Sequence, residues 1–175
     1  MFRFSRFMLL ISLCISSIAS YADDHPLLIP VAPQCTLERI ASEPKIALEE
    51  CLMRAQLGYA DAQFVLGEYW YQGQYTPRDY QQALKWFEQA SVQGHADAQL
   101  RLGTIFYRGE GVPSNSIQAY IVFKMSAING SDEALDQADR VAAQMQRNEL
   151  ELANQVLAQI FRNYLLELSS ETTLP

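Results

Sequence analysis

Few residues of this chain stand at spacings that could support catalysis. Neither of its two histidines, His25 and His95, has a serine or an acid at a spacing typical of a nucleophilic pair, and neither lies near a cysteine at zinc-ligand spacing. The Gly109-x-Gly111 segment lacks the preceding strand and the lysine of a phosphate-binding loop. The sequence therefore predicts no catalytic residue, no metal site and no cofactor.

Two acids at equivalent positions, Asp61 and Asp97, resemble a carboxylate pair. Each falls in the first turn of a predicted helix, where a negative charge interacts favourably with the helix dipole and the unpaired amide groups. His95 stands where Tyr59 stands one copy earlier and fits a turn residue. We interpret the two acids as parts of helix starts and His95 as a turn residue, rather than as a general acid and base.

Side chains suited to binding follow one face of two predicted helices. Positions four or three residues apart share a helix face, and we call the face formed by positions 61, 65, 68 and 72 together with 97, 101, 104 and 108 the polar stripe. A peptide could lie across it, with arginines binding its carboxylates. An ordinary solvated face is the alternative. In sequence, the stripe contains Asp61, Val65, Glu68, Gln72, Asp97, Arg101, Thr104 and Arg108.

Two tyrosines, Tyr75 and Tyr80, have no aromatic counterpart one copy later, where Gly111 and Ser116 stand. Because packing residues repeat, these unrepeated aromatics are better candidates for a surface patch. The predicted partner-binding residues are therefore Glu68, Gln72, Tyr75, Tyr80, Arg101, Thr104 and Arg108.

The elements that position these residues repeat every 36 positions. The segment GYADAQ at 58–63 returns as GHADAQ at 94–99 and, more weakly, as GSDEA at 130–134. A fixed period of this size is typical of stacked helix pairs, so we expect an all-α fold, an α/α solenoid. Full repeats cover 58–93 and 94–129, and a half-repeat with a C-terminal capping helix covers 130–168.

Helix boundaries follow from glycine and proline punctuation. First helices are predicted over 60–72 and 96–108, second helices over 78–93 and 114–129, and the last two helices over 131–146 and 149–168. Asn148 and Glu151 have the spacing of a capping motif for the last helix. Gly67 and Gly103 stand inside the first helices, where glycine costs about 1 kcal/mol, so we expect a close helix approach there.

These residues resemble the Sel-1-like repeat, a relative of the tetratricopeptide repeat, over about 44–168. One departure is Tyr75, which stands where the second copy has the loop glycine Gly111. The resemblance implies helix-turn-helix repeats without shared catalytic residues, and similar exported bacterial proteins act as adaptors or regulators of envelope assemblies. The matching pattern reads Ala60-x-Ala62-Gln63-x-x-Leu66-Gly67-x-x-x-Tyr71-x-Gly73, then Ala83-x-x-Trp86-Phe87-x-x-Ala90-x-x-Gly94.

The first 22 residues have the pattern of a secretory signal peptide. Arg3 and Arg6 precede an apolar run over 7–18, and Ser20-Tyr21-Ala22 fits a cleavage site. An uncleaved anchor is the alternative, whereas the flanks of Cys14 do not fit a lipoprotein. A Pro-rich leader and N-terminal cap follow over 23–43, the solenoid over 44–168 and a frayed tail over 169–175. We expect a periplasmic or secreted protein.

Cys35 and Cys51 remain after cleavage and form an even pair in an oxidising compartment, which favours a disulfide over two free thiols. The formal net charge of −7 argues against nucleic acid and anionic lipid as partners. We predict a non-catalytic scaffold or adaptor of the bacterial cell envelope that binds another protein or a peptide segment, with a monomer favoured. The alternatives are an envelope hydrolase with an unrecognised site and a self-associating structural component.

Overall fold

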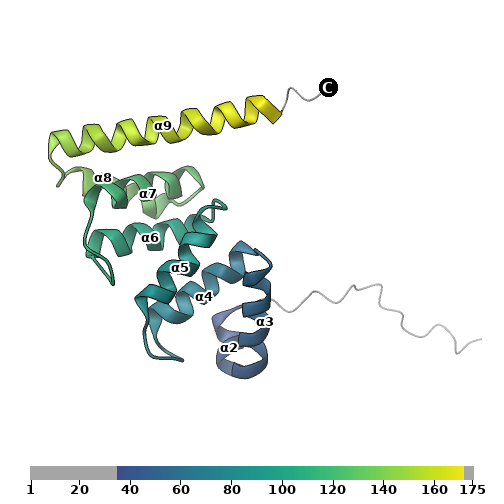
Figure 1. The fold of residues 1–175 in the computed structure, drawn as a ribbon. Coiled ribbons are helices and arrows are strands. Elements are labelled where there is room, and N and C mark those ends of the chain that lie inside the picture. The colour runs from purple at the N-terminus through teal and green to yellow at the C-terminus, as the bar shows by residue number, and fades with distance from the viewer. Residues whose placement is uncertain (1–34, 172–175) are drawn as a thin grey trace, which may run out of the picture. The chain divides into compact units, whose positions relative to one another are not determined.

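The computed structural model describes residues 35–171, and in this range the chain is helical (Figure 1). The predicted signal peptide over 1–22, the leader over 23–34 and the end of the tail over 172–175 lie outside the described residues. In order, the helices are α2 (Leu37–Ser42), α3 (Pro44–Gln56), α4 (Ala60–Gln72), α5 (Tyr80–Ser91), α6 (Ala96–Arg108), α7 (Ser116–Ile128), α8 (Asp132–Ala142) and α9 (Arg147–Glu171).

The helices stack in chain order, α4 with α5, α6 with α7, and then α8 beside α7 (Figure 1). The predicted all-α solenoid with a C-terminal capping helix is confirmed, because α9 covers the last repeat through contacts with α7. Within residues 35–171, every helix is too short or too polar to cross a membrane.

In each repeat, the backbone of the first helix contacts an aromatic ring of the second helix. A Cβ placed on Gly67 would lie 2.4 Å from the ring of Phe87 in α5, and one placed on Gly103 would lie 2.5 Å from the ring of Phe123 in α7. Both rings are almost fully buried. The predicted close approach is confirmed, and it explains why both first helices tolerate an interior glycine.

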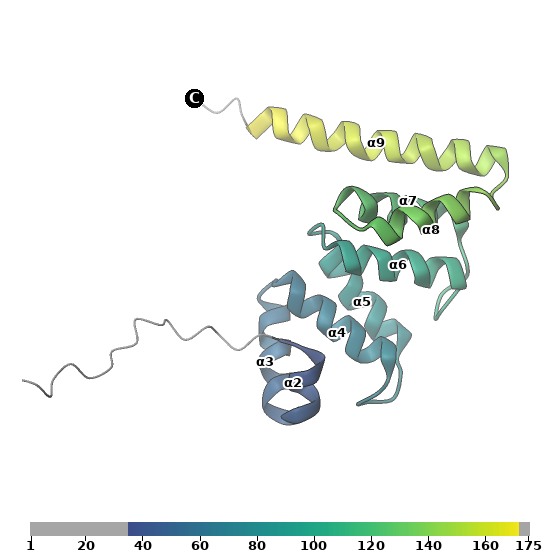
Figure 2. The ribbon, with the colours of Figure 1, turned by 180° about the vertical axis from the view of Figure 1, so that it is seen from behind.

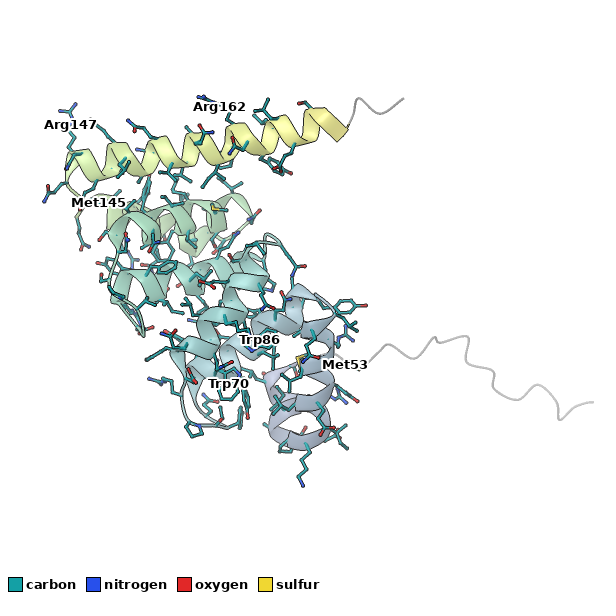
Figure 3. All side chains as sticks on the ribbon, in the orientation of Figure 1. Met53, Trp70, Trp86, Met145, Arg147 and Arg162 are labelled. Atoms are coloured by element: carbon teal, nitrogen blue, oxygen red, sulfur yellow. A yellow bond between two sulfur atoms is a disulfide. The ribbon has the colours of Figure 1, made fainter. Side chains whose placement is uncertain are left out.

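Three apolar clusters follow one another along the solenoid. The first joins Ile40 of α2 to Trp86 of α5, the second is centred on Phe87, and the third joins α7, α8 and α9 around Phe123. Trp70 of α4 is half-buried and packs against the first two clusters, and Figure 3 labels it together with Trp86 of α5. Side chains of neighbouring repeats therefore pack in the same clusters, and such contacts between neighbours stabilise a solenoid.

A buried glutamine links each repeat to its neighbours. The Gln63 amide donates to the Ala55 carbonyl at 3.0 Å, and the equivalent Gln99 amide donates to the Ser91 carbonyl at 2.9 Å. The Gln99 side-chain oxygen accepts from the Asn129 amide at 2.8 Å. Gln99 is 1% exposed, so its amide cannot form hydrogen bonds with water. The bonds to Ser91 and Asn129 take their place.

We expect Gln99→Met to lower the free energy of unfolding by about 1–3 kcal/mol, because the Ser91 carbonyl and the Asn129 amide lose their partner. Urea unfolding followed by circular dichroism measures this change. The matched control is Gln82→Met on exposed α5 surface, which should cost less than about 0.5 kcal/mol. Equal costs for the two variants would contradict the role assigned to Gln99.

The second helices begin later than predicted because a polar side chain caps each of them. Asp79 accepts from the amides of Gln81 and Gln82, and Asn115 accepts from the amide of Gln118. The preceding loops close alike, with the Asp79 and Asn115 amides donating to carbonyls in α4 and α6. The two loops thus share this closure even though Tyr75 stands where the second copy has Gly111.

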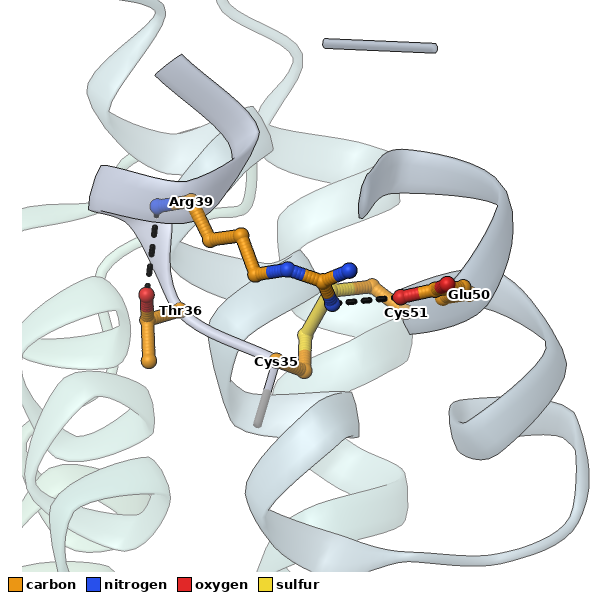
Figure 4. The surroundings of a disulfide bond; sticks show 5 residues. All are labelled: Cys35, Thr36, Arg39, Glu50 and Cys51. Carbon is orange, nitrogen blue, oxygen red and sulfur yellow. Dashed lines mark hydrogen bonds and ion pairs between the residues drawn. A yellow bond between two sulfur atoms is a disulfide. The ribbon is translucent and has the colours of Figure 1, made fainter. Parts of the chain in front are cut away.

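The N-terminal cap is held by a disulfide between Cys35 and Cys51, as predicted, which joins the start of α2 to α3 (Figure 4). Thr36 caps α2 by accepting from the Arg39 amide at 3.2 Å. The Arg39 guanidinium forms an ion pair with Glu50 of α3, and the hydrogen bond to Glu50 raises the pKa of Arg39. The short helix α2 is therefore fixed to α3 by covalent and ionic contacts.

The last helix starts earlier and runs longer than predicted. It begins at Arg147, and the Glu149 carboxylate accepts from the main-chain amide of Gln146 at 2.8 Å. The expectation that Asn148 and Glu151 form the cap was therefore wrong, because Glu149 takes that role two residues earlier. In its first half, Ala153 and Leu157 are buried against the third cluster.

Candidate functional site

The polar stripe contains an ion pair that crosses from one repeat to the next. Glu68 of α4 accepts from Arg101 of α6 at 2.6 Å (Nε to Oε1) and 3.3 Å (Nη2 to Oε2), and it also accepts from the Gln72 amide. The two-point contact fixes the plane of the guanidinium. The arginine predicted to bind a partner carboxylate thus already binds a carboxylate of its own chain.

Glu68 differs from the exposed residue that the sequence led us to expect. It is only 5% exposed, whereas the Arg101 side chain is 39% exposed. A buried carboxylate needs a partner, because an unpaired charge in this position would be strongly destabilising. Glu68 therefore holds Arg101 in place, and the surface itself is formed by Arg101.

A second set of polar contacts continues along the stripe from Arg101. The Arg101 guanidinium lies over the ring of Tyr71, 5.5 Å from its centre, and the Tyr71 hydroxyl donates to Glu110 at 2.8 Å. Arg108 lies 3.6 Å from the same carboxylate. Burial, and then the hydrogen bond to Glu110, raises the pKa of Tyr71, so the hydroxyl stays a donor.

The remaining predicted residues lie at the edges of this arrangement. The Arg108 side chain is 62% exposed and Tyr75 is 46% exposed, so both are accessible to a partner. Thr104 is half-buried, and its hydroxyl donates to the Leu100 carbonyl of its own helix at 2.9 Å. Tyr80 is also half-buried, packed edge-on against Tyr71.

Sequence reasoning missed Tyr71 and Glu110 as parts of the site. The Tyr71 ring packs against the second cluster, and its hydroxyl fixes Glu110. The recurrence of Tyr71 as Tyr107 was the available indication. The Tyr107 hydroxyl likewise donates to the following repeat, to Gln144 at 2.9 Å.

His95 and Asp61 meet between the two repeats. His95 Nδ1 accepts from the Ala98 amide at the start of α6, which makes His95 the N-cap residue. Its other nitrogen lies 3.4 Å from the Asp61 carboxylate, and the ring stacks on Phe64. His95, expected to be a turn residue, thus lies just before α6 as its N-cap.

Comparison with known proteins identifies the repeat. The family model described as Sel1 repeat matches residues 60–95 and 96–131, two adjoining copies of the predicted length. Sel1 repeat proteins are generally non-catalytic scaffolds that bind other proteins. No curated protein matches the chain.

Several solved structures are similar to this chain, two of them as follows. One is c5321, a protective antigen of uropathogenic Escherichia coli strains with an SLR fold, at 28% identity and a TM-score of 0.63 over 74% of this chain and 28% of that one. The other is a Sel1 repeat protein from Oxalobacter formigenes, at 30% identity and a TM-score of 0.51 over 53% of this chain and 38% of that one. The chain thus spans less than two-fifths of either relative. With the helix pairs and the two matched repeats, these likenesses show that the chain is a Sel1-like repeat protein.

Proposed function

We propose that this protein is an adaptor of the bacterial cell envelope that binds an acidic segment of a partner protein along the polar stripe. The observation that carries the proposal is the exposed guanidinium of Arg108, which lies on the same face of α6 as the anchored Arg101, about two turns away, in a chain with a net charge of −7. Glu68 fixes the orientation of Arg101, whereas Arg108 is exposed and can turn, and each guanidinium can donate to a partner carboxylate.

Location in the periplasm or outside the cell is supported by two observations. The first 22 residues have the pattern of a signal peptide, and the Cys35–Cys51 disulfide suits an oxidising compartment. Both fit a scaffold whose partner is also exported. The alternative of an envelope hydrolase gains no support from the contacts around His95, the histidine within the described residues.

The site is already partly ordered, which favours binding. Arg101 is held by Glu68 and Tyr71, so binding a partner carboxylate would cost little further side-chain entropy at Arg101. Arg108 lies between solvent and Glu110 and can turn toward a ligand. Tyr75 adds an exposed aromatic ring at the loop after α4.

The Glu68–Arg101 pair determines which substitution tests the proposal. Arg101→Glu would place a second carboxylate beside the buried Glu68 and destabilise the repeat, so lost binding would have two explanations. Arg108→Glu changes an exposed side chain and leaves that pair intact. The matched control is Lys85→Glu, an equal charge reversal on exposed α5 surface.

We expect Arg108→Glu to weaken capture of the native partner from envelope extract by about 10-fold or more, as for one charge-assisted contact replaced by repulsion. Lys85→Glu should capture the partner as the unchanged protein does. Raising the salt concentration should weaken partner capture by the unchanged protein and diminish the difference in capture between the variants. Full capture by Arg108→Glu would refute the assignment of binding to the polar stripe.

A further inference from the structure

The second half of α9 does not pack closely against the repeats. The helix extends past the end of α7 in both views (Figures 1 and 2), and its apolar side chains continue at helical spacing from the buried Leu157 to Phe161 and Tyr164. Phe161 is 37% exposed and Tyr164 58% exposed. The side that covers the core in the first half of the helix is therefore uncovered in the second half.

A cleft of about 460 Å³ lies under this half of α9. Its opposite wall comes from the ends of α5 and α7, where Val92 is 84% exposed and Ile128 59% exposed. Every side chain that lines the cleft is uncharged. Arg162, by contrast, lies on the side of α9 that faces away from the repeats (Figure 3).

The surface has the size of one side of a stable interface. The cleft wall and the exposed side of α9 present apolar surface on the order of 500 Å², counting about 150–250 Å² for a whole aromatic side chain. About 57% of the area of an interface is apolar, so about 500 Å² of apolar surface corresponds to roughly 800–900 Å² of buried surface per partner. The usual value is about 800 Å² per partner.

Charge and shape both indicate a second copy as the occupant. Two copies of a chain with a net charge of −7 repel each other, and the uncharged cleft allows contact without placing acids together. A two-fold interface requires a patch that complements itself. The exposed apolar side of α9 and the apolar wall of the cleft lie side by side, so two copies related by a two-fold axis can place one against the other.

We propose that the C-terminal half of α9 pairs with its counterpart in a second copy across a two-fold axis, so that apolar side chains of each helix cover the mouth of the other's cleft. Tyr164 and Phe161 of each copy then lie against Val92 and Ile128 of the partner subunit. The proposal replaces the monomer favoured from the sequence, and it leaves the polar stripe of each copy free to bind.

The test compares two charged substitutions on opposite sides of the same helix. Tyr164 lines the cleft and is 58% exposed, whereas Leu166 lies on the opposite side and is 62% exposed. Mass is measured by light scattering and sedimentation equilibrium on the purified full chain from about 1 µM to 1 mM, a range that covers weak and moderate dimers. Circular dichroism checks that each variant is folded.

We expect the unchanged protein to shift from one to two copies with rising concentration. Tyr164→Glu should raise the dissociation constant by about 30-fold or more, as for a central interface residue. Leu166→Glu should dimerise as the unchanged protein does. A strict monomer at all concentrations would overturn the proposal, as would an equal effect of both variants. A single copy that purifies with a different polypeptide, and loses it on Tyr164→Glu, would also overturn the proposal. That polypeptide would then be the occupant of the surface.

Discussion

Gly67→Val is expected to lower the free energy of unfolding by about 3 kcal/mol, the upper part of the range for overpacked cores. Even a Cβ at this position lies 2.4 Å from the Phe87 ring, and Phe87 is fully buried, so the ring cannot turn into free space. The valine must therefore separate α4 from α5. Urea denaturation of the purified protein measures the change.

A compensating substitution distinguishes this clash from the ordinary helix propensity of valine. Phe87→Leu shortens the side chain that meets position 67, so the double variant should be more stable than the summed costs imply, by more than about 1 kcal/mol. Purely additive costs would mean that the ring contact is not the cause. Gly103 and Phe123 offer the same test one repeat later.

Loss of the Cys35–Cys51 disulfide is expected to lower the free energy of unfolding by about 3 kcal/mol. The bridge spans 16 residues, and in the chain-entropy model a loop of this length stabilises the fold by about that amount. Unfolding with and without a reducing agent measures the loss. The double variant Cys35→Ala with Cys51→Ala should be insensitive to the reducing agent. Equal stability of the oxidised and reduced protein would contradict a structural role for the bridge.

The first helix of each repeat could be predicted to the residue, whereas other boundaries could not. The starts of α4 and α6 and the glycines that follow them are local features of the sequence. The second helices begin where Asp79 and Asn115 cap them, and several polar residues nearby could have done so. The start of α9 was missed for the same reason.

The polar stripe was predictable as a set of residues on one face, but its internal contacts were not. Glu68 and Arg101 do not occupy equivalent repeat positions, since Glu68 corresponds to Thr104 and Arg101 to Val65. Their pairing depends on the lateral offset between stacked repeats, which a one-dimensional pattern does not contain. The uncovered half of α9 was missed similarly, because periodicity predicts an apolar side without indicating what covers it.

Site-specific photo-crosslinking in the native cell tests the proposed adaptor function most directly. A photoreactive aromatic residue in place of Tyr75, a predicted partner-binding residue that is 46% exposed, reports on the binding surface and leaves Arg101 and Arg108 unchanged. One at position 85 reports on the exposed surface of α5. If a partner segment binds there, position 75 forms a covalent adduct with one envelope protein and position 85 does not. Adducts at position 85 alone, or none at position 75, would contradict binding at this surface.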